Sequence, residues 1–98
     1  MGKRENEFQS WVIDELRDRI PGCVILKNDP DYLQGMSDIL VLYHDKYAVL
    51  ECKREANAPV RPNQKYYVDL FSEWSYGAFI YPENAEEVLR GVQQTLQP

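Results

Sequence analysis

Two apolar runs on either side of a short polar stretch constrain the fold of this chain most strongly: MSDILVLYHDKYAVLECK, from Met36 to Lys53. Their aliphatic and β-branched residues predict two strands, over 38–43 and 47–53, joined by a turn at 44–46. An aspartate heads the first run, and a Glu-Cys-Lys triplet ends the second. A hairpin does not need charged residues at these positions, so their placement indicates a role other than folding.

The segments before the hairpin predict a helix, a strand and a turn. Apolar residues at helical spacing predict an amphipathic helix over 5–20, with Phe8 and Trp11 on its buried side, and a Pro-Gly pair ends it. A β-branched run over 23–27 predicts a strand. The segment over 28–35 is rich in turn-forming residues and leads into the hairpin.

The segments after the hairpin predict a loop, two helices and a strand. The two prolines of 54–63 exclude a helix and a central strand, so this segment is a predicted loop. Asn63 is predicted to cap the helix that follows, and Asn84 to cap the last helix, after a strand over 76–81. The buried side of the helix after the loop is predicted to carry Tyr66, Tyr67, Leu70, Phe71 and Trp74. The order is α-β-β-β-α-β-α, and the fold class is α/β with a mixed sheet.

Length and composition bound the class of protein. Ninety-eight residues, 44% of them hydrophobic, predict one domain over 1–98. No apolar run reaches the roughly 18 residues that span a membrane, and the N-terminal segment lacks the apolar core of a signal peptide. We therefore expect a cytoplasmic protein with no membrane partner. Cys23 and Cys52 form no CxxC pair and the chain has one histidine, which argues against a structural zinc site.

The net charge of −5 taken alone argues against a nucleic-acid partner, since proteins that bind nucleic acids usually carry a basic footprint. The distribution of the charge weakens this argument. From Lys53 to Lys65 there are four basic residues against Glu55 alone, and the excess acid lies mainly in the first helix and the tail. Acidic residues that bind a divalent cation would also be neutralised. A nucleic-acid partner therefore stays open.

The geometry of a hairpin brings its charged residues together. Side chains alternate along a strand, so Glu51 and Lys53 point to the same side and Cys52 to the other. A tight turn places the start of the first strand beside the end of the second. We therefore expect Asp38 next to Glu51 and Lys53, so that two carboxylates and an ammonium group meet at the open end of the hairpin.

This set of groups fits metal-assisted hydrolysis of a phosphodiester. Mg²⁺ prefers oxygen ligands and usually takes one or two carboxylates, here Asp38 and Glu51, with the Cys52 carbonyl as a third oxygen. Lys53 is then placed to hold or deprotonate the attacking water, or to neutralise charge on the phosphorus centre. Glu7 is a further possible ligand if the first helix packs across the site.

These residues resemble the signature of the PD-(D/E)xK nuclease superfamily. An acidic residue follows a small one in Ser37-Asp38, and a hydrophobic strand then ends in Glu51-Cys52-Lys53. The predicted order of elements is similar to the common core of that superfamily. The resemblance implies a restriction-endonuclease-like core and covers nearly the whole chain.

More narrowly, GMSDILVL, LECK and NQKYYVDL resemble the VRR-NUC branch. That branch carries a Gly-x-x-Asp start, here from Gly35, a Glu-x-Lys, and a glutamine that opens the next helix, here Gln64. Its N-terminal helix usually offers a glutamate, which Glu7 matches. The chain departs from the pattern at Met36 and Ser37, where Pro or Val is more usual.

The resemblance implies a divalent-metal-dependent DNA endonuclease. Its cofactor is Mg²⁺ or Mn²⁺, and its preferred substrate is branched DNA such as a four-way junction. It also implies a homodimer, which the apolar surface of so small a chain and the two cuts of a junction favour as well. The implied catalytic residues are Asp38, Glu51, Lys53 and Gln64.

Less specific interpretations of each feature remain open. The Glu51 and Lys53 pair alone is common on edge strands, and the aromatic stripe over 66–74 is more typical of a core than of a base-stacking surface. Beside a nuclease site, basic and hydroxyl side chains become candidates for contacts to DNA. The protein can also be a non-catalytic nucleic-acid-binding or assembly subunit, or a small protein-interaction module. The candidate DNA contacts are Lys27, Arg54, Arg61, Lys65 and Tyr67.

Overall fold

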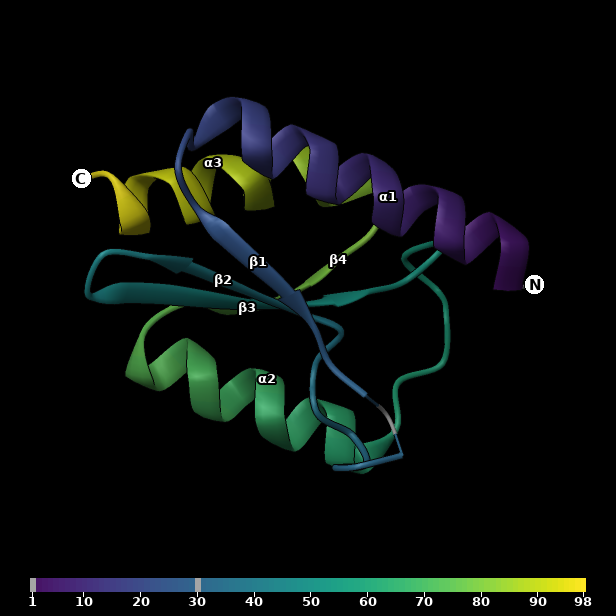
Figure 1. Cartoon of the computed structure of the whole chain (residues 1–98). Coiled ribbons are helices and arrows are strands. Elements are labelled where there is room, and N and C mark those ends of the chain that lie inside the picture. The colour runs from purple at the N-terminus through teal and green to yellow at the C-terminus, as the bar shows by residue number, and fades with distance from the viewer. Residues whose placement is uncertain (1, 30) are drawn as a thin grey trace.

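Four strands form one sheet in the order β1-β2-β3-β4, and helices cover both of its faces (Figure 1). The computed structural model describes the backbone of residues 2–29 and 31–98 and the side chains of residues 6–29 and 31–98. Met1, and Pro30 of the predicted turn, lie outside these residues. The elements are α1 (Gly2–Arg19), β1 (Val24–Lys27), β2 (Ile39–Tyr43), β3 (Lys46–Cys52), α2 (Pro62–Trp74), β4 (Gly77–Ile80), a short 3₁₀ helix η1 (Pro82–Asn84) and α3 (Ala85–Leu96).

The order of the elements confirms the predicted α-β-β-β-α-β-α succession and the mixed α/β class. Strand β2 pairs antiparallel with both β1 and β3, whereas β4 runs parallel to β3 after the crossover through α2. None of the helices in the described part of the chain is long and apolar enough to cross a membrane.

The hairpin of β2 and β3 is tighter than predicted. Tyr43 pairs with Lys46, so the turn consists of His44 and Asp45 alone. His44 has a φ of 56°, the left-handed conformation that the favoured two-residue hairpin turns need at their first central position. The register that follows from this turn places Ile39 opposite Leu50.

The main core lies on the face of the sheet that α1 and α3 cover (Figure 1). Alternate residues of β2 and β3 point to this face and are fully buried, as are residues of α1 spaced four apart. Trp11 was predicted to be buried with them and is exposed instead. The reason is that the buried stripe of α1 is narrow and Trp11 lies about 100° from it around the helix. The core residues of β2, β3, α1 and α3 include Ile39, Val41, Ala48, Leu50, Val12, Leu16, Ile20, Leu89 and Val92.

Helix α2 covers the opposite face, and its buried side differs from the prediction. Val68 is its buried residue, whereas Tyr66 and Trp74 are 60% and 62% exposed. The cause is a close approach of α2 to β4. A Cβ atom at Gly77 would lie 2.7 Å from the Val68 carbonyl oxygen, so the backbones of helix and strand meet there. This contact turns Val68 toward the sheet. Tyr66 and Trp74 then lie on a side of the helix that is exposed to solvent.

The predicted start of α2 also needs correction. Arg61, not Asn63, is the residue that precedes the helix, and Pro62 occupies its first turn. Proline is well accommodated there because its missing N–H has no partner in the helix anyway. The predicted loop over 54–63 therefore ends two residues early, and Gln64 becomes the third residue of the helix.

Candidate functional site

The register of the hairpin brings Asp38 and Glu51 to one end of the sheet. Asp38 immediately precedes β2, and Ile39 pairs with Leu50, so the Asp38 position lies opposite Glu51. One Asp38 carboxylate oxygen, Oδ2, accepts a hydrogen bond of 2.8 Å from the backbone N–H of Cys52. Both carboxylates belong to the face of the sheet on which α2 packs, since they alternate with the core residues Ile39 and Leu50.

In the described part of the chain, the buried charged residues are Glu51 and Lys53. Glu51 is 5% exposed and Lys53 is 8% exposed. The Lys53 ammonium lies 3.9 Å from Glu51 Oε2. It also donates hydrogen bonds to the Pro59 carbonyl at 3.0 Å and to Gln64 Oε1 at 2.8 Å. Burial of a charge is costly unless it is paired and hydrogen-bonded, and these contacts meet that condition.

Gln64 joins the two buried charges. Its amide nitrogen donates to Glu51 Oε2 at 3.0 Å, while its amide oxygen accepts from Lys53. The same oxygen accepts a bond of 3.1 Å from the Arg61 backbone N–H, which otherwise has no partner within the helix. Gln64 therefore ties the first turn of α2 to Glu51 of β3 and to Lys53, which directly follows β3.

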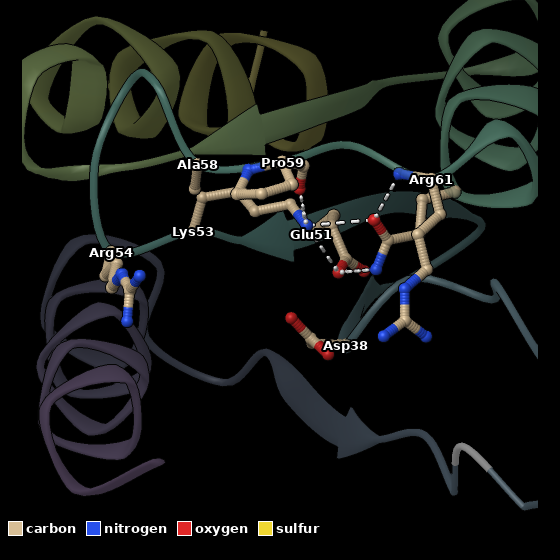
Figure 2. A pocket seen from close by; sticks show the side chains of 8 residues that line it. Asp38, Glu51, Lys53, Arg54, Ala58, Pro59 and Arg61 are labelled. Atoms are coloured by element: carbon tan, nitrogen blue, oxygen red, sulfur yellow. Dashed lines mark hydrogen bonds and ion pairs between the residues drawn. The ribbon is translucent and has the colours of Figure 1, made fainter. Parts of the chain in front are cut away.

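These side chains surround one cavity of about 380 Å³ (Figure 2). Figure 2 shows Asp38 and Glu51 between two arginines, with Arg54 on one side and Arg61 on the other. A smaller pocket of about 200 Å³ adjoins it. The residues that line both are Asp38, Glu51, Arg61 and Gln64. The larger cavity is lined by Asp38, Glu51, Lys53, Arg54, Ala58, Pro59, Arg61 and Gln64.

The remaining predicted site residues lie outside both cavities. Glu7 is exposed on α1. Lys65 is exposed and pairs with Asp69 one turn along α2. Tyr67 is half-buried. Lys27 pairs with Ile39, so it points to the face of the sheet opposite Asp38.

Within the described residues, no group of three or more His, Cys, Asp or Glu side chains lies close enough to hold a metal ion. The acidic donors at the site are therefore the two carboxylates of Asp38 and Glu51. Two carboxylates suit Mg²⁺, which keeps several water molecules, better than an ion that needs a cage of protein ligands. The Cys52 carbonyl stays a predicted third donor.

Two contacts at the site were missed at the level of sequence. The Pro59 carbonyl is a partner of Lys53, and no pattern in the chain indicated which carbonyl of the loop would turn inward. Asn28 holds the peptide ahead of Asp38: its side-chain amide donates to the Ser37 carbonyl, and its backbone N–H donates to the Asp38 carbonyl at 2.9 Å. An asparagine beside a turn was the available signal for the second contact.

Comparisons of the chain with models of protein families, with curated proteins and with solved structures gave no significant match.

Proposed function

We propose that this protein is a divalent-metal-dependent DNA endonuclease with a restriction-endonuclease-like core of the VRR-NUC type. One observation carries the proposal: Asp38, Glu51 and Lys53 line a single cavity at one end of the sheet. Gln64 and the Pro59 carbonyl hold Lys53 there, so a buried ammonium group lies 3.9 Å from Glu51 and lines the same cavity as Asp38. A charge pair on a strand that served stability alone would not need a cavity in front of it.

The residues of the site divide the work of phosphodiester hydrolysis. Hydrolysis forms one P–O bond from water and breaks one P–O bond to the sugar, whose oxygen takes up a proton. Asp38 and Glu51 would hold Mg²⁺ or Mn²⁺, which when bound supplies a Lewis acid and an activated water. Lys53 has three N–H donors, and its hydrogen bonds to the protein use two of them. We expect the third to reach the water or the phosphate, where the positive charge would offset the charge that builds up.

Arg54 and Arg61 provide the contacts to the DNA backbone in this proposal. Both line the cavity, and they lie on either side of Asp38 in Figure 2. Guanidinium groups bind phosphate in a two-pronged geometry, so one strand can run past the carboxylates with a phosphate at each arginine. Three other predicted DNA contacts lie outside the cavity and would touch DNA only at the periphery of the site: Lys27, Lys65 and Tyr67.

We also propose that the active unit is a homodimer that prefers branched DNA. The face of the sheet under α2 is left open over β1 and β2, where Val24 and Leu26 are exposed beside Leu42 and Leu40. Trp74 of α2 is exposed next to Phe71 at the edge of the same face. Pairing of this apolar surface with its copy about a two-fold axis would cover it. Two sites would then stand at a set distance, which suits two cuts on a branched substrate.

Cleavage assays with matched variants test the catalytic proposal. We expect cleavage by the wild-type protein with Mg²⁺ on a panel of linear, flapped and four-way DNA, and loss of it in Asp38→Asn and Glu51→Gln. Binding of DNA should survive or tighten, since either change removes a negative charge near the phosphate. Asp45→Asn, in the exposed turn at the other end of the hairpin, is the control and should cut normally. Wild-type rates in both site variants would refute the assignment, and binding without cleavage by the wild type would indicate a non-catalytic subunit.

The dimer has its own test. Sedimentation equilibrium at micromolar concentration should give twice the monomer mass for the wild type. Trp74→Arg should give the monomer mass, because it places a charge in the proposed interface. A wild-type monomer that nicks linear and branched DNA equally would overturn both the dimer and the preference for branched DNA.

A further inference from the structure

A second pocket borders Lys53, between the loop after β3 and the end of β4. Its volume is about 380 Å³, at the small end of the range of about 300–1,000 Å³ for ligand pockets. It shares Lys53 and Ala58 with the cavity of the candidate site, so the two cavities meet at these residues. The lining residues are Lys53, Ala56, Ala58, Val60, Phe79, Tyr81 and Asn84.

The walls of this pocket are mainly apolar and aromatic. Phe79 pairs with Glu51 across the parallel ladder, so its ring lies on the same face of the sheet as the candidate site. Tyr81 lies two residues further on, and Val60 closes the pocket from the loop. None of the residues that line the pocket is acidic. A ligand that carries a phosphate therefore meets no carboxylate here.

Asn84 contributes a side-chain amide to the pocket, and this group can both donate and accept hydrogen bonds. Its amide oxygen accepts from the Tyr81 backbone N–H at 2.9 Å, and its amide nitrogen donates to the Phe79 carbonyl at 3.0 Å. An asparagine amide has two donor hydrogens and two acceptor positions. After these two bonds, the Asn84 amide has one donor hydrogen and one acceptor position left. The edge of a nucleobase carries acceptors and donors that can pair with both.

We propose that this pocket binds an unstacked nucleobase next to the phosphate held at the candidate site. The proposal rests on the nuclease function proposed above and deepens it. Aromatic side chains bind the faces of unpaired bases, whereas a base inside a duplex must first leave its stack. Lys53 lies where the two cavities meet, so the base and the phosphate would be close together. They would belong either to the same nucleotide or to two adjacent nucleotides of one strand. The substrate class is thus DNA with unpaired nucleotides at the cut, as a branch point supplies.

The test uses DNA that lacks one base. Substrates carry a single abasic site at one of the positions that flank the mapped cut. We expect cleavage to fall by about tenfold or more when one particular position is abasic, in line with the loss of one base–aromatic contact. Equal cleavage of every abasic substrate and the intact one would overturn the proposal.

A pair of loop variants tests the same pocket in the protein. Val60 is 46% exposed and lines the pocket, so Val60→Trp should fill it without disturbing the core. This variant should cut the intact substrate as slowly as the wild type cuts the abasic one, and should lose little more on the abasic substrate. Asn57→Trp, on the same loop but outside the pocket, should cut as the wild type does. Wild-type rates for Val60→Trp would refute the pocket.

A binding measurement separates this inference from the nuclease proposal. Single-stranded DNA with 2-aminopurine at the sensitive position, or at each position in turn if no cut is found, is titrated with protein in Ca²⁺. We expect a fluorescence change that Val60→Trp removes and Asn57→Trp keeps. That result without any cleavage in Mg²⁺ or Mn²⁺ would support the pocket and overturn the nuclease. Cleavage without any such change would support the nuclease and overturn the pocket, and absence of DNA binding would overturn both.

Discussion

Replacement of Gln64 by leucine should destabilise the folded protein, because it removes the link between two buried charges. The change deletes one bond to Glu51, one to Lys53 and one to the Arg61 backbone. Hydrogen bonds to charged groups contribute about 1.5–3 kcal/mol each and an ordinary one about 1 kcal/mol, so the three together reach roughly 4–7 kcal/mol. Water can enter the cavity beside Gln64 and replace part of this loss. We therefore expect a loss of about 2–3 kcal/mol.

This loss is large for a chain of 98 residues. Domains of this size unfold with a free energy of about 5–15 kcal/mol, and each kcal/mol shifts the midpoint temperature by about 4–8 °C. The assay is urea unfolding followed by tryptophan fluorescence, with the denaturant slope checked for two-state behaviour.

The control is Lys65→Leu on the same turn of α2. Lys65 forms an exposed ion pair with Asp69, and such pairs contribute about 0–1 kcal/mol. The control should therefore stay close to the wild type. A Gln64→Leu protein as stable as Lys65→Leu would refute the argument that Gln64 holds Glu51 and Lys53 together in the folded state.

Three further outcomes are expected, the first and third from the structure and the second from the proposed function. Gly77→Ala should destabilise the protein by about 1–3 kcal/mol in urea unfolding, because the new methyl group would press α2 away from β4, and an unchanged midpoint would contradict that contact. Ca²⁺ should support DNA binding in a mobility-shift assay but not cleavage, since its looser coordination fits poorly where Mg²⁺ imposes octahedral geometry, so rapid cleavage in Ca²⁺ would count against the mechanism. Burial raises the pKa of the Cys23 thiol, so it should stay protonated and alkylate slowly at mildly alkaline pH. Site-resolved mass spectrometry of native and urea-unfolded protein checks this, and equal rates would refute it. The raised pKa also means that the thiol's contribution to stability is present below the ordinary thiol range and is lost as the pH rises through the folded pKa.

Features that depend on neighbours in the chain were predicted well from the sequence. The hairpin and the juxtaposition of Asp38 with Glu51 follow from alternation along a strand and from a short turn. Both are local properties, so a run of about 18 residues was enough to specify them. The acidic and basic residues of the proposed metal-assisted site were visible for the same reason.

Features that depend on how elements pack were decided by the tertiary structure. The aromatic stripe of α2 was expected in the core, yet the close contact at Gly77 turns Val68 inward and leaves Trp74 exposed. The side of a helix that becomes buried depends on where its partner surface lies, and an amphipathic pattern alone does not contain that position. The hydrogen bonds of Gln64 and the Pro59 carbonyl to Lys53 are of the same kind, since segments 6 and 11 residues away reach it only in the folded chain. The residue types of the site thus come from local sequence, whereas the cavity that they line comes from packing.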